Sequence, residues 1–389
     1  MRFFFLVILA FFGFEGVAVA QAGSLDAEVL AKADFVVQPE VFIRHTAERA
    51  FIGPGTVLLE NGDVLMAAPW GRPPTNFDEI AAKFPVPMLY RSSDGGRVWK
   101  EEGRMKMKWN LRGLISDGGA SFLRLRDGRL AVVFNRNMPG LHGGGTPAMA
   151  FSDDDGRTWS AAKLLIENDD AFYVMNDRLI QLRSARLLLP VARKLGKSEG
   201  DRDEGLTMIS DDAGATWRLS AGSARIEAPR GMAEPCAAEL KDGSVLMLGR
   251  TGEGSHFAAT SWDGGETWSS PEPTTLTAAC SPLTLKTLPD GRLIVFYNHA
   301  KPLQAGAFFP RTPLCYAVSG DGGKTWGAPV VVDDEGAEKK DRQNIYPSVC
   351  FTKEGMLVVW STHAADPKGS WASDYKIGGA KRAVLGYPK

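Results

Sequence analysis

The chain has 389 residues, 44% of them hydrophobic, and a formal net charge of −1 from 45 basic and 46 acidic residues. This length allows a large buried core. The balanced charge gives no general attraction to nucleic acid, so we expect no nucleic-acid partner.

The N-terminus has the pattern of a secretory signal peptide. Arg2 is followed by an almost wholly apolar run at residues 3–14, and small residues precede Gln21. The apolar run is too short to span a bilayer, which takes about 20 residues, and no later segment is long and apolar enough. We predict cleavage after Ala20, a mature domain at residues 21–389 and a secreted or periplasmic protein; an uncleaved anchor is the alternative.

Next along the chain is an apolar, β-branched stretch at residues 35–43, which predicts a strand. An element with two apolar runs around a tight turn then occurs six times. Asn-Gly or Asp-Gly between apolar runs is a strong β-hairpin signal, and four of the copies carry one of them. The predicted hairpins lie at residues 56–66, 122–132, 179–189, 237–247, 284–294 and 349–359.

A second repeated element follows each of the first five hairpins. Its pattern is Ser-x-Asp-x-Gly-x-Thr-Trp, and only the first copy departs from it, with Val98 in place of Thr. Ser and Asp side chains can bond turn backbone, Gly supplies a positive φ, and Trp can anchor the turn in apolar surface. The copies, which we call boxes one to five, lie at residues 92–99, 152–159, 210–217, 261–268 and 319–326.

Each hairpin with its box supplies about four strands, so the repeat predicts an all-β, six-bladed β-propeller with four-stranded antiparallel blades. The alternative, a parallel β-solenoid, would need shorter repeats. The last hairpin has no box after it. We expect its outer strands from residues 375–386, with the N-terminal strand closing the ring.

The cysteines and histidines predict no metal site. The five histidines are scattered, and the four cysteines match no zinc spacing. Export permits disulfides, and buried free thiols are equally compatible with the sequence. We expect no metal and no cofactor; the cysteines are Cys236, Cys280, Cys315 and Cys350.

Five boxes on a six-unit pattern resemble the sialidase (neuraminidase) superfamily, also described as BNR or Asp-box repeat proteins. The resemblance covers nearly the whole mature chain. Sialidases hold the substrate carboxylate with three arginines, attack with a tyrosine paired with a glutamate, and use an aspartate as acid and base. Because other propellers also carry such boxes, function must come from the site.

Three segments resemble the catalytic segments of that family. Glu234 to Arg250 resembles the segment that carries the tyrosine's partner and a carboxylate-binding arginine. The segments at Arg311 and Tyr346 resemble those of another arginine and of the nucleophile. The arginine fork suits a carboxylate because it donates two parallel hydrogen bonds. Each of the four residues could instead be structural, as an ion-pair or core residue.

The opening of the third unit, Asn176-Asp177-Arg178, resembles another segment that lines the family's pocket. Its polar residues lead straight into an apolar strand, which favours the rim of a pocket. The resemblance implies Asp177 and Arg178 as substrate-binding residues. A structural pair of these two residues is the alternative.

The first unit departs from the family. Sialidases carry an arginine before the first hairpin, and this chain has Ile52 there. Arg72 is our candidate for the missing contact; Arg44 and Arg49 also lie nearby. Asp78 is the best candidate for the acid/base, at a longer spacing than usual, and the neighbouring Glu79 could serve instead.

The resemblance implies an exo-glycosidase that removes a terminal sialic acid or a related acidic sugar with retention at the anomeric carbon. The expected partner is a glycan or acidic sugar, with no obligate protein partner. Two alternatives stay open: a non-catalytic carbohydrate-binding propeller, and a polysaccharide lyase acting on uronates. His142 or His299 beside Tyr346 would favour the lyase.

Overall fold

The computed structural model divides into two units, Met1–Leu30 and Ala31–Lys389. The predicted signal peptide lies outside the described residues. The structure describes residues 30–46, 52–68, 86–111, 114–137, 144–168, 170–196, 202–302, 310–338, 341–365 and 378–389.

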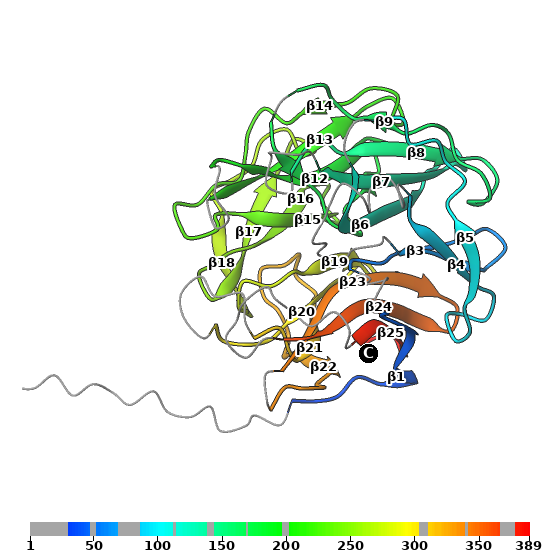
Figure 1. Ribbon diagram of the computed structural model, residues 1–389. Coiled ribbons are helices and arrows are strands. Elements are labelled where there is room, and N and C mark those ends of the chain that lie inside the picture. The colour runs from blue at the N-terminus through cyan, green and yellow to red at the C-terminus, as the bar shows by residue number, and fades with distance from the viewer. Residues whose placement is uncertain are drawn as a thin grey trace, which may run out of the picture. The chain divides into compact units, whose positions relative to one another are not determined.

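The described part of Ala31–Lys389 forms six antiparallel sheets and no helix, which confirms the predicted six-bladed propeller (Figure 1). In chain order, the first three blades are β2 (Gly55–Leu58), β3 (Val64–Ala68), β4 (Met88–Ser92) and β5 (Lys100–Arg104); β6 (Leu114–Arg124), β7 (Leu130–Asn137), β8 (Ala148–Ser152) and β9 (Lys163–Leu164); and β10 (Phe172–Tyr173), β11 (Ile180–Gln181), β12 (Leu187–Lys194), β13 (Asp203–Ser210) and β14 (Arg218–Leu219).

The other three blades are β15 (Ala233–Glu239), β16 (Val245–Arg250), β17 (Ser255–Ser261) and β18 (Glu272–Thr277); β19 (Thr284–Thr287), β20 (Leu293–Asn298), β21 (Leu314–Ser319) and β22 (Val330–Asp333); and β23 (Arg342–Thr352), β24 (Gly355–Ala364), β25 (Gly378–Leu385) and β1 (Phe35–Arg44). All six predicted hairpins are present. Blade three differs in that its inner strand is split into β10 and β11, which both pair with β12.

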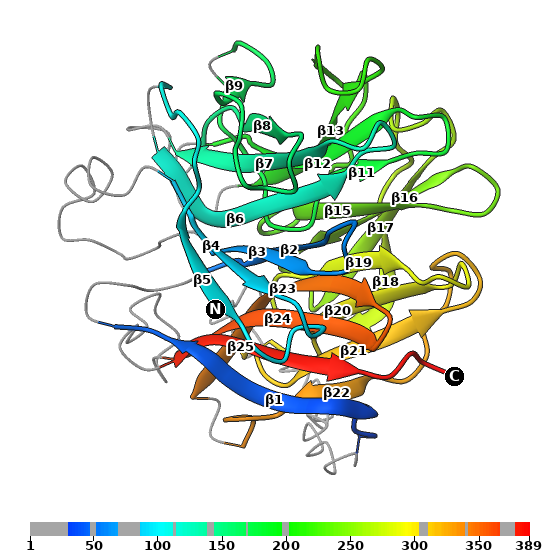
Figure 2. The ribbon, with the colours of Figure 1, turned by 90° about the vertical axis from the view of Figure 1, so that its right-hand side faces the viewer.

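The first and last described strands meet in blade six. The N-terminal strand β1 pairs antiparallel with β25, and Figure 2 shows the two strands side by side. The inner strands β2 and β23, of the first and last blades, also contact each other. The ring is therefore closed by both termini of the propeller, as the sequence predicts.

Apolar side chains fill the spaces between neighbouring blades. The middle strands β3, β16 and β20 are buried along their whole length, because other blades cover both of their faces. Separate hydrophobic clusters join blades one and two, two and three, five and six, and six and one. The described residues include no helix that is long and apolar enough to cross a membrane.

The boxes form the predicted turns between the third and fourth strands. In box two, the Asp154 carboxylate accepts bonds from the Thr158 amide at 2.8 Å and the Thr158 hydroxyl at 2.6 Å. Gly156 has φ +80°, and an added Cβ would lie 2.4 Å from the Leu65 side chain of blade one. The positive φ favours glycine in this turn, and the absence of a Cβ lets the Leu65 side chain pack closely against it.

Strand direction divides the propeller into two ends. In blade four, β15 and β16 join at the pair Glu239–Val245 and separate at the pair Ala233–Arg250. Hairpin tips and boxes lie at the first end, which we call the box end. The start of β15 and the end of β16 lie at the other, which we call the site end.

Candidate active site

Tyr346 and Glu234 meet at the site end. Tyr346 lies in β23 of blade six and Glu234 in β15 of blade four, 112 residues apart in the sequence. The Tyr346 hydroxyl donates to Glu234 Oε1 at 3.1 Å. Both residues are buried, at 6% and 5% exposure. The fold thus builds a phenol–carboxylate pair shielded from bulk water.

The backbone is irregular at both residues. Tyr346 has φ +53° and Glu234 has φ +44°, a region that residues other than glycine rarely adopt. The strand register shifts at the same places, between Ile345 and Ser348 and between Ala233 and Cys236. Bulges of this kind re-aim side chains, and strained backbone often marks functional sites.

Two arginines flank this pair, and both are fully buried. Arg250, the last residue of β16, places Nη1 2.7 Å from Glu234 Oε2 and donates from Nε to Cys280 Sγ at 3.2 Å. The bonds of Arg311 include two long ones, to Gln343 Oε1 at 3.4 Å and to the Cys280 carbonyl at 3.5 Å. Four residues predicted from three separate segments therefore gather in one cluster.

The arginines set the ionisation of the cluster. Burial alone would raise the pKa of Glu234, but the positive charges around it, first Arg250 and then Arg311, bring that pKa below its usual value. Burial and the neighbouring Arg250 lower the pKa of Arg311 to about 10. At neutral pH the cluster holds an ionised carboxylate and charged guanidinium groups.

The predicted Asp177 and Arg178 face protein groups in the structure. Asp177 accepts from the Ser348 hydroxyl at 3.0 Å and the Val349 amide at 2.7 Å, and pairs with Lys286 at 3.2 Å. Asp177 and Arg178 therefore do not form an ion pair with each other, which was the alternative.

Arg178 is 1% exposed and donates to three backbone carbonyls. They belong to Asn176 at 2.7 Å, Leu283 at 2.9 Å and Glu234 at 3.4 Å. The segment therefore ties blade three to blades four, five and six across the centre of the ring, and it holds the backbone of Glu234.

Ile52, at the position where sialidases carry an arginine, is 8% exposed. It packs in an apolar cluster with Tyr173, Met175 and Tyr346. Arg44 lies exposed in β1, at the outer edge of blade six. The other candidates from blade one, Arg49, Arg72, Asp78 and Glu79, lie outside the described residues.

A second phenol–carboxylate pair, which sequence reasoning missed, lies in the same region. The Tyr173 hydroxyl donates to the Asp203 carboxylate, and both residues are buried. Burial raises the pKa of Tyr173, and the charges of Asp203 and Glu234 raise it further. Burial also raises the pKa of Asp203, against the opposing effect of the bond from Tyr173. No local signal marks these residues, because the pair forms between two strands 30 residues apart.

The described histidines lie apart from one another, except for His45 and His363. Among the residues that the structure describes, no group of three or more His, Cys, Asp or Glu side chains could hold a metal ion. His45 stacks on His363, with ring centroids 4.8 Å apart, and His299 Nδ1 lies 3.2 Å from the Tyr297 hydroxyl. His142 lies outside the described residues. All four cysteines are buried and unbridged.

Comparisons with known proteins agree with this fold. The family model described as "BNR repeat-like domain" matches residues 123–359. No curated protein matches the chain.

Among solved structures, a protein of unknown function from Dyadobacter fermentans is 19% identical with a TM-score of 0.65, covering 91% of this chain and 99% of that one. A Hadza microbial sialidase is 18% identical with a TM-score of 0.61, covering 88% of this chain and 66% of that one. The intramolecular trans-sialidase of Ruminococcus gnavus, in complex with oseltamivir carboxylate, is 16% identical with a TM-score of 0.62, covering 92% and 98%. At these identities the likeness establishes a sialidase-type fold.

The family model spans more than half of the chain and covers boxes two to five and both residues of the Tyr346–Glu234 pair. The chain belongs to the BNR repeat-like domain family and has the six-bladed propeller fold of sialidases.

Proposed function

We propose that the protein is an exo-glycosidase that hydrolyses a terminal sialic acid or a related acidic sugar with retention at the anomeric carbon. One observation carries this proposal. A buried tyrosine hydroxyl is hydrogen-bonded to a buried carboxylate, with two buried arginines beside them. A phenol is a suitable nucleophile for an anionic sugar because, when neutral, it approaches the substrate carboxylate without charge repulsion.

In the proposed first step, Tyr346 Oη attacks the anomeric carbon and its proton passes to Glu234 Oε1. The glycosidic C–O bond breaks, and an acid donates a proton to the leaving oxygen. Asp78 is our candidate for that acid; this role stays a prediction. The products of this step are a glycosyl-tyrosine and the free aglycone.

In the second step, the ionised acid takes a proton from water, and the water oxygen attacks the anomeric carbon. The bond to Tyr346 breaks, and its oxygen recovers the proton from Glu234. Two displacements restore the original anomeric configuration. The sum is hydrolysis of one glycosidic bond, with the protein unchanged.

The charges of the site fit this sequence of steps. A phenol with a pKa near ~10 needs a base within hydrogen-bond reach, and Glu234 is ionised at neutral pH because the arginines lower its pKa. Arg250 and Arg311 would also hold the sugar carboxylate. The long bonds of Arg311, at 3.4 and 3.5 Å, can give way to shorter bonds with a ligand.

We infer positioning roles for Asp177 and Arg178, which the family resemblance marked as pocket residues. Arg178 holds the Glu234 backbone, and Asp177 fixes the backbone of β23 just after Tyr346. Their contribution to substrate binding then comes through the catalytic pair that they hold in place.

Because Ile52 is apolar, we assign the clamp to Arg250 and Arg311 among the described residues of the site. We propose that Arg72 supplies a third contact to the sugar. The carboxylate would otherwise be bound more weakly than in a three-arginine site. We also propose that the protein acts outside the cytoplasm, in the periplasm or after secretion, on glycans that reach it there.

The test is release of a fluorescent aglycone from glycosides of N-acetylneuraminic acid and of uronic acids. We expect wild type to hydrolyse one of them, and Tyr346→Phe to lose about 1,000-fold or more in kcat because the nucleophile is gone. Tyr316→Phe is the matched control, since Tyr316 is a core tyrosine between blades five and six.

Hydrolysis that survives Tyr346→Phe would contradict the proposed nucleophile. Absence of release from every glycoside, together with binding of the acidic sugar, would favour the carbohydrate-binding alternative. Formation of an unsaturated product from a uronate polymer would favour the lyase.

A further inference from the structure

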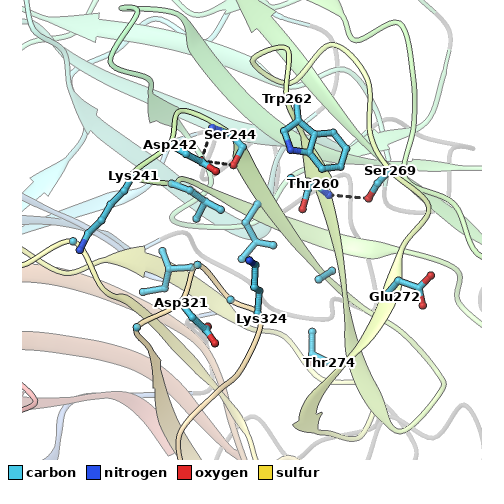
Figure 3. Close-up of a pocket in the computed structure, with 18 of the residues that line it drawn as sticks. Lys241, Asp242, Ser244, Thr260, Trp262, Ser269, Glu272, Thr274, Asp321 and Lys324 are labelled. Carbon is cyan, nitrogen blue, oxygen red and sulfur yellow. Dashed lines mark hydrogen bonds between the residues drawn. The ribbon is translucent and has the colours of Figure 1, made fainter.

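A groove of about 630 Å³ lies at the box end, between blades four and five. It is formed by the hairpin tip and box of blade four on one side and the corresponding turns of blade five on the other (Figure 3). It lies at the opposite end of the strands from Glu234 and Arg250, so the proposed reaction does not account for it.

The rim of this groove carries Trp262, which is 75% exposed. Trp262 is the second residue of box four, where the other boxes have Ser93, Asp153, Asp211 and Gly320. The turn does not need an aromatic residue at this position, because Trp268 provides the anchoring indole of the same box. An exposed indole offers a flat apolar surface on which a ligand can pack.

Polar groups of both kinds surround the indole. Figure 3 shows the Lys324 ammonium pointing into the middle of the groove, with the Thr260 hydroxyl beside Trp262 and the Glu272 carboxylate farther along the wall. Within the described part of the chain, the side chains of Lys324 and Glu272 make no hydrogen bond or ion pair, although, beside local hydrogen bonds, the charge of Lys324 helps to lower the pKa of Asp242. The groove therefore offers donors and acceptors next to an apolar plane.

The charges indicate the class of ligand. The charged lining residues are two lysines, Lys241 and Lys324, and three acids, Asp242, Glu272 and Asp321. A polyanion would meet more negative than positive charge here. A neutral sugar fits better, because its hydroxyls both donate and accept while the C–H face of its ring packs on the indole.

We propose that this groove is a second, non-catalytic binding site for the neutral part of a glycan chain, with a pyranose ring stacked on Trp262 and its hydroxyls bonded to Lys324, Thr260 and Glu272. The site stands on the groove alone and does not depend on the proposed hydrolysis. Its position at the box end would let the protein hold a glycan while the site end remains open.

The test is affinity electrophoresis of the full chain through gels that contain galactan, xylan, hydroxyethylcellulose or polygalacturonate. We expect at least one neutral polymer to retard wild type, and Trp262→Ala to weaken that retardation at least about tenfold because the stacking plane is lost. Lys324→Met should weaken it less. Val98→Ala, which removes an exposed apolar side chain from box one, is the control and should bind as wild type does.

Tyr346→Phe should also bind as wild type does, so a failure of the catalytic proposal leaves this test intact. Retardation by no neutral polymer, or equal retardation of Trp262→Ala, would overturn the proposal. Retardation by the anionic polymer polygalacturonate alone would contradict the proposal that the ligand is a neutral sugar. Sedimentation that shows a dimer lost in Trp262→Ala would assign the surface to a second copy of the chain instead.

Discussion

The two ends of the propeller use polar side chains in opposite ways. At the box end, the contacts among the Ser, Asp and Thr side chains of a box are local. In box two, Ser152 and Thr158 both donate a hydrogen bond to Asp154, and the three residues lie within seven positions of the sequence. At the site end, partners come from different blades: Tyr346 and Glu234 are 112 residues apart, and Asn176 reaches the Pro54 carbonyl across 122 residues.

This difference separates scaffold from chemistry. A box repeats because five of the six blades use the same turn, and the box carboxylate is bonded within that turn. The site end does not repeat, because each blade contributes a different group to one shared cluster. Substitutions of the residues that the boxes share should therefore change stability alone, whereas substitutions at the site end should change activity.

The largest effect is expected at the site end, from Glu234→Gln. The amide keeps the size of the side chain but cannot take the proton of Tyr346. We expect kcat to fall by about 100- to 10,000-fold, with the folded structure retained. Initial rates on the hydrolysed glycoside and a circular dichroism spectrum check this. Loss of less than about tenfold would remove Glu234 from its proposed role.

The same substitution should also lower stability, by an amount that depends on pH. Glu234→Gln leaves Arg250 buried without its carboxylate, which costs about 3 kcal/mol at neutral pH. The folded-state pKa of Glu234 is lowered, so the stability of the wild-type pair is present above the unfolded value of 4.5 and is lost as pH falls through the folded value.

The difference in unfolding free energy between wild type and Glu234→Gln should therefore stay constant from about pH 7 down to the unfolded value of 4.5, and shrink as the pH falls further. Urea unfolding at each pH measures it. A difference that stays constant or grows below that value would show that Glu234 does not carry the charge assigned to it.

At the box end, Asp154→Ala should lower stability without changing the reaction. It removes the acceptor of the Thr158 amide and hydroxyl bonds, which costs about 1–2 kcal/mol in a largely exposed turn. Urea unfolding should detect this loss, and kcat/KM at room temperature should match wild type. A large loss of kcat/KM in a folded variant would break the division between the two ends.

The smallest effect is expected from Val98→Thr in box one. Asp94 accepts the Arg97 and Val98 amides at 3.0 and 2.9 Å, but residue 98 has no hydroxyl to complete the turn as Thr158 does. Adding that hydroxyl should stabilise the protein by about 0.5 kcal/mol. The measurement is the thermal unfolding midpoint of the variant and of wild type, with Val98→Ala as the control for loss of the exposed valine. A lower midpoint for Val98→Thr than for wild type would contradict the shared role of the boxes.

The same difference explains what the sequence could predict. Hairpins and boxes are local patterns, so the blades and their order could be predicted directly. Glu234, Arg250, Arg311 and Tyr346 could be placed only through the family resemblance, and the structure brings them together. The partners of Arg178 could not be predicted, because they are backbone carbonyls supplied by other blades.

Two further features depended on the three-dimensional fold alone. Tyr173 reads as part of an apolar strand, and its bond to Asp203 forms only when blade three is assembled. Trp262 occupies the second position of a box, which differs from box to box, and only the fold shows that it lines a groove. Both are contacts between segments whose meeting no local pattern indicates.

The most direct test of the catalytic account is to trap the glycosyl-enzyme. The protein is incubated with a fluorinated analogue of the acidic sugar that it hydrolyses, because the fluorine slows the second step more than the first. Mass spectrometry of the digested protein then locates the label. We predict one sugar on the peptide that contains Tyr346, and none on Tyr346→Phe. A label on another residue, or hydrolysis without any covalent intermediate, would contradict the account.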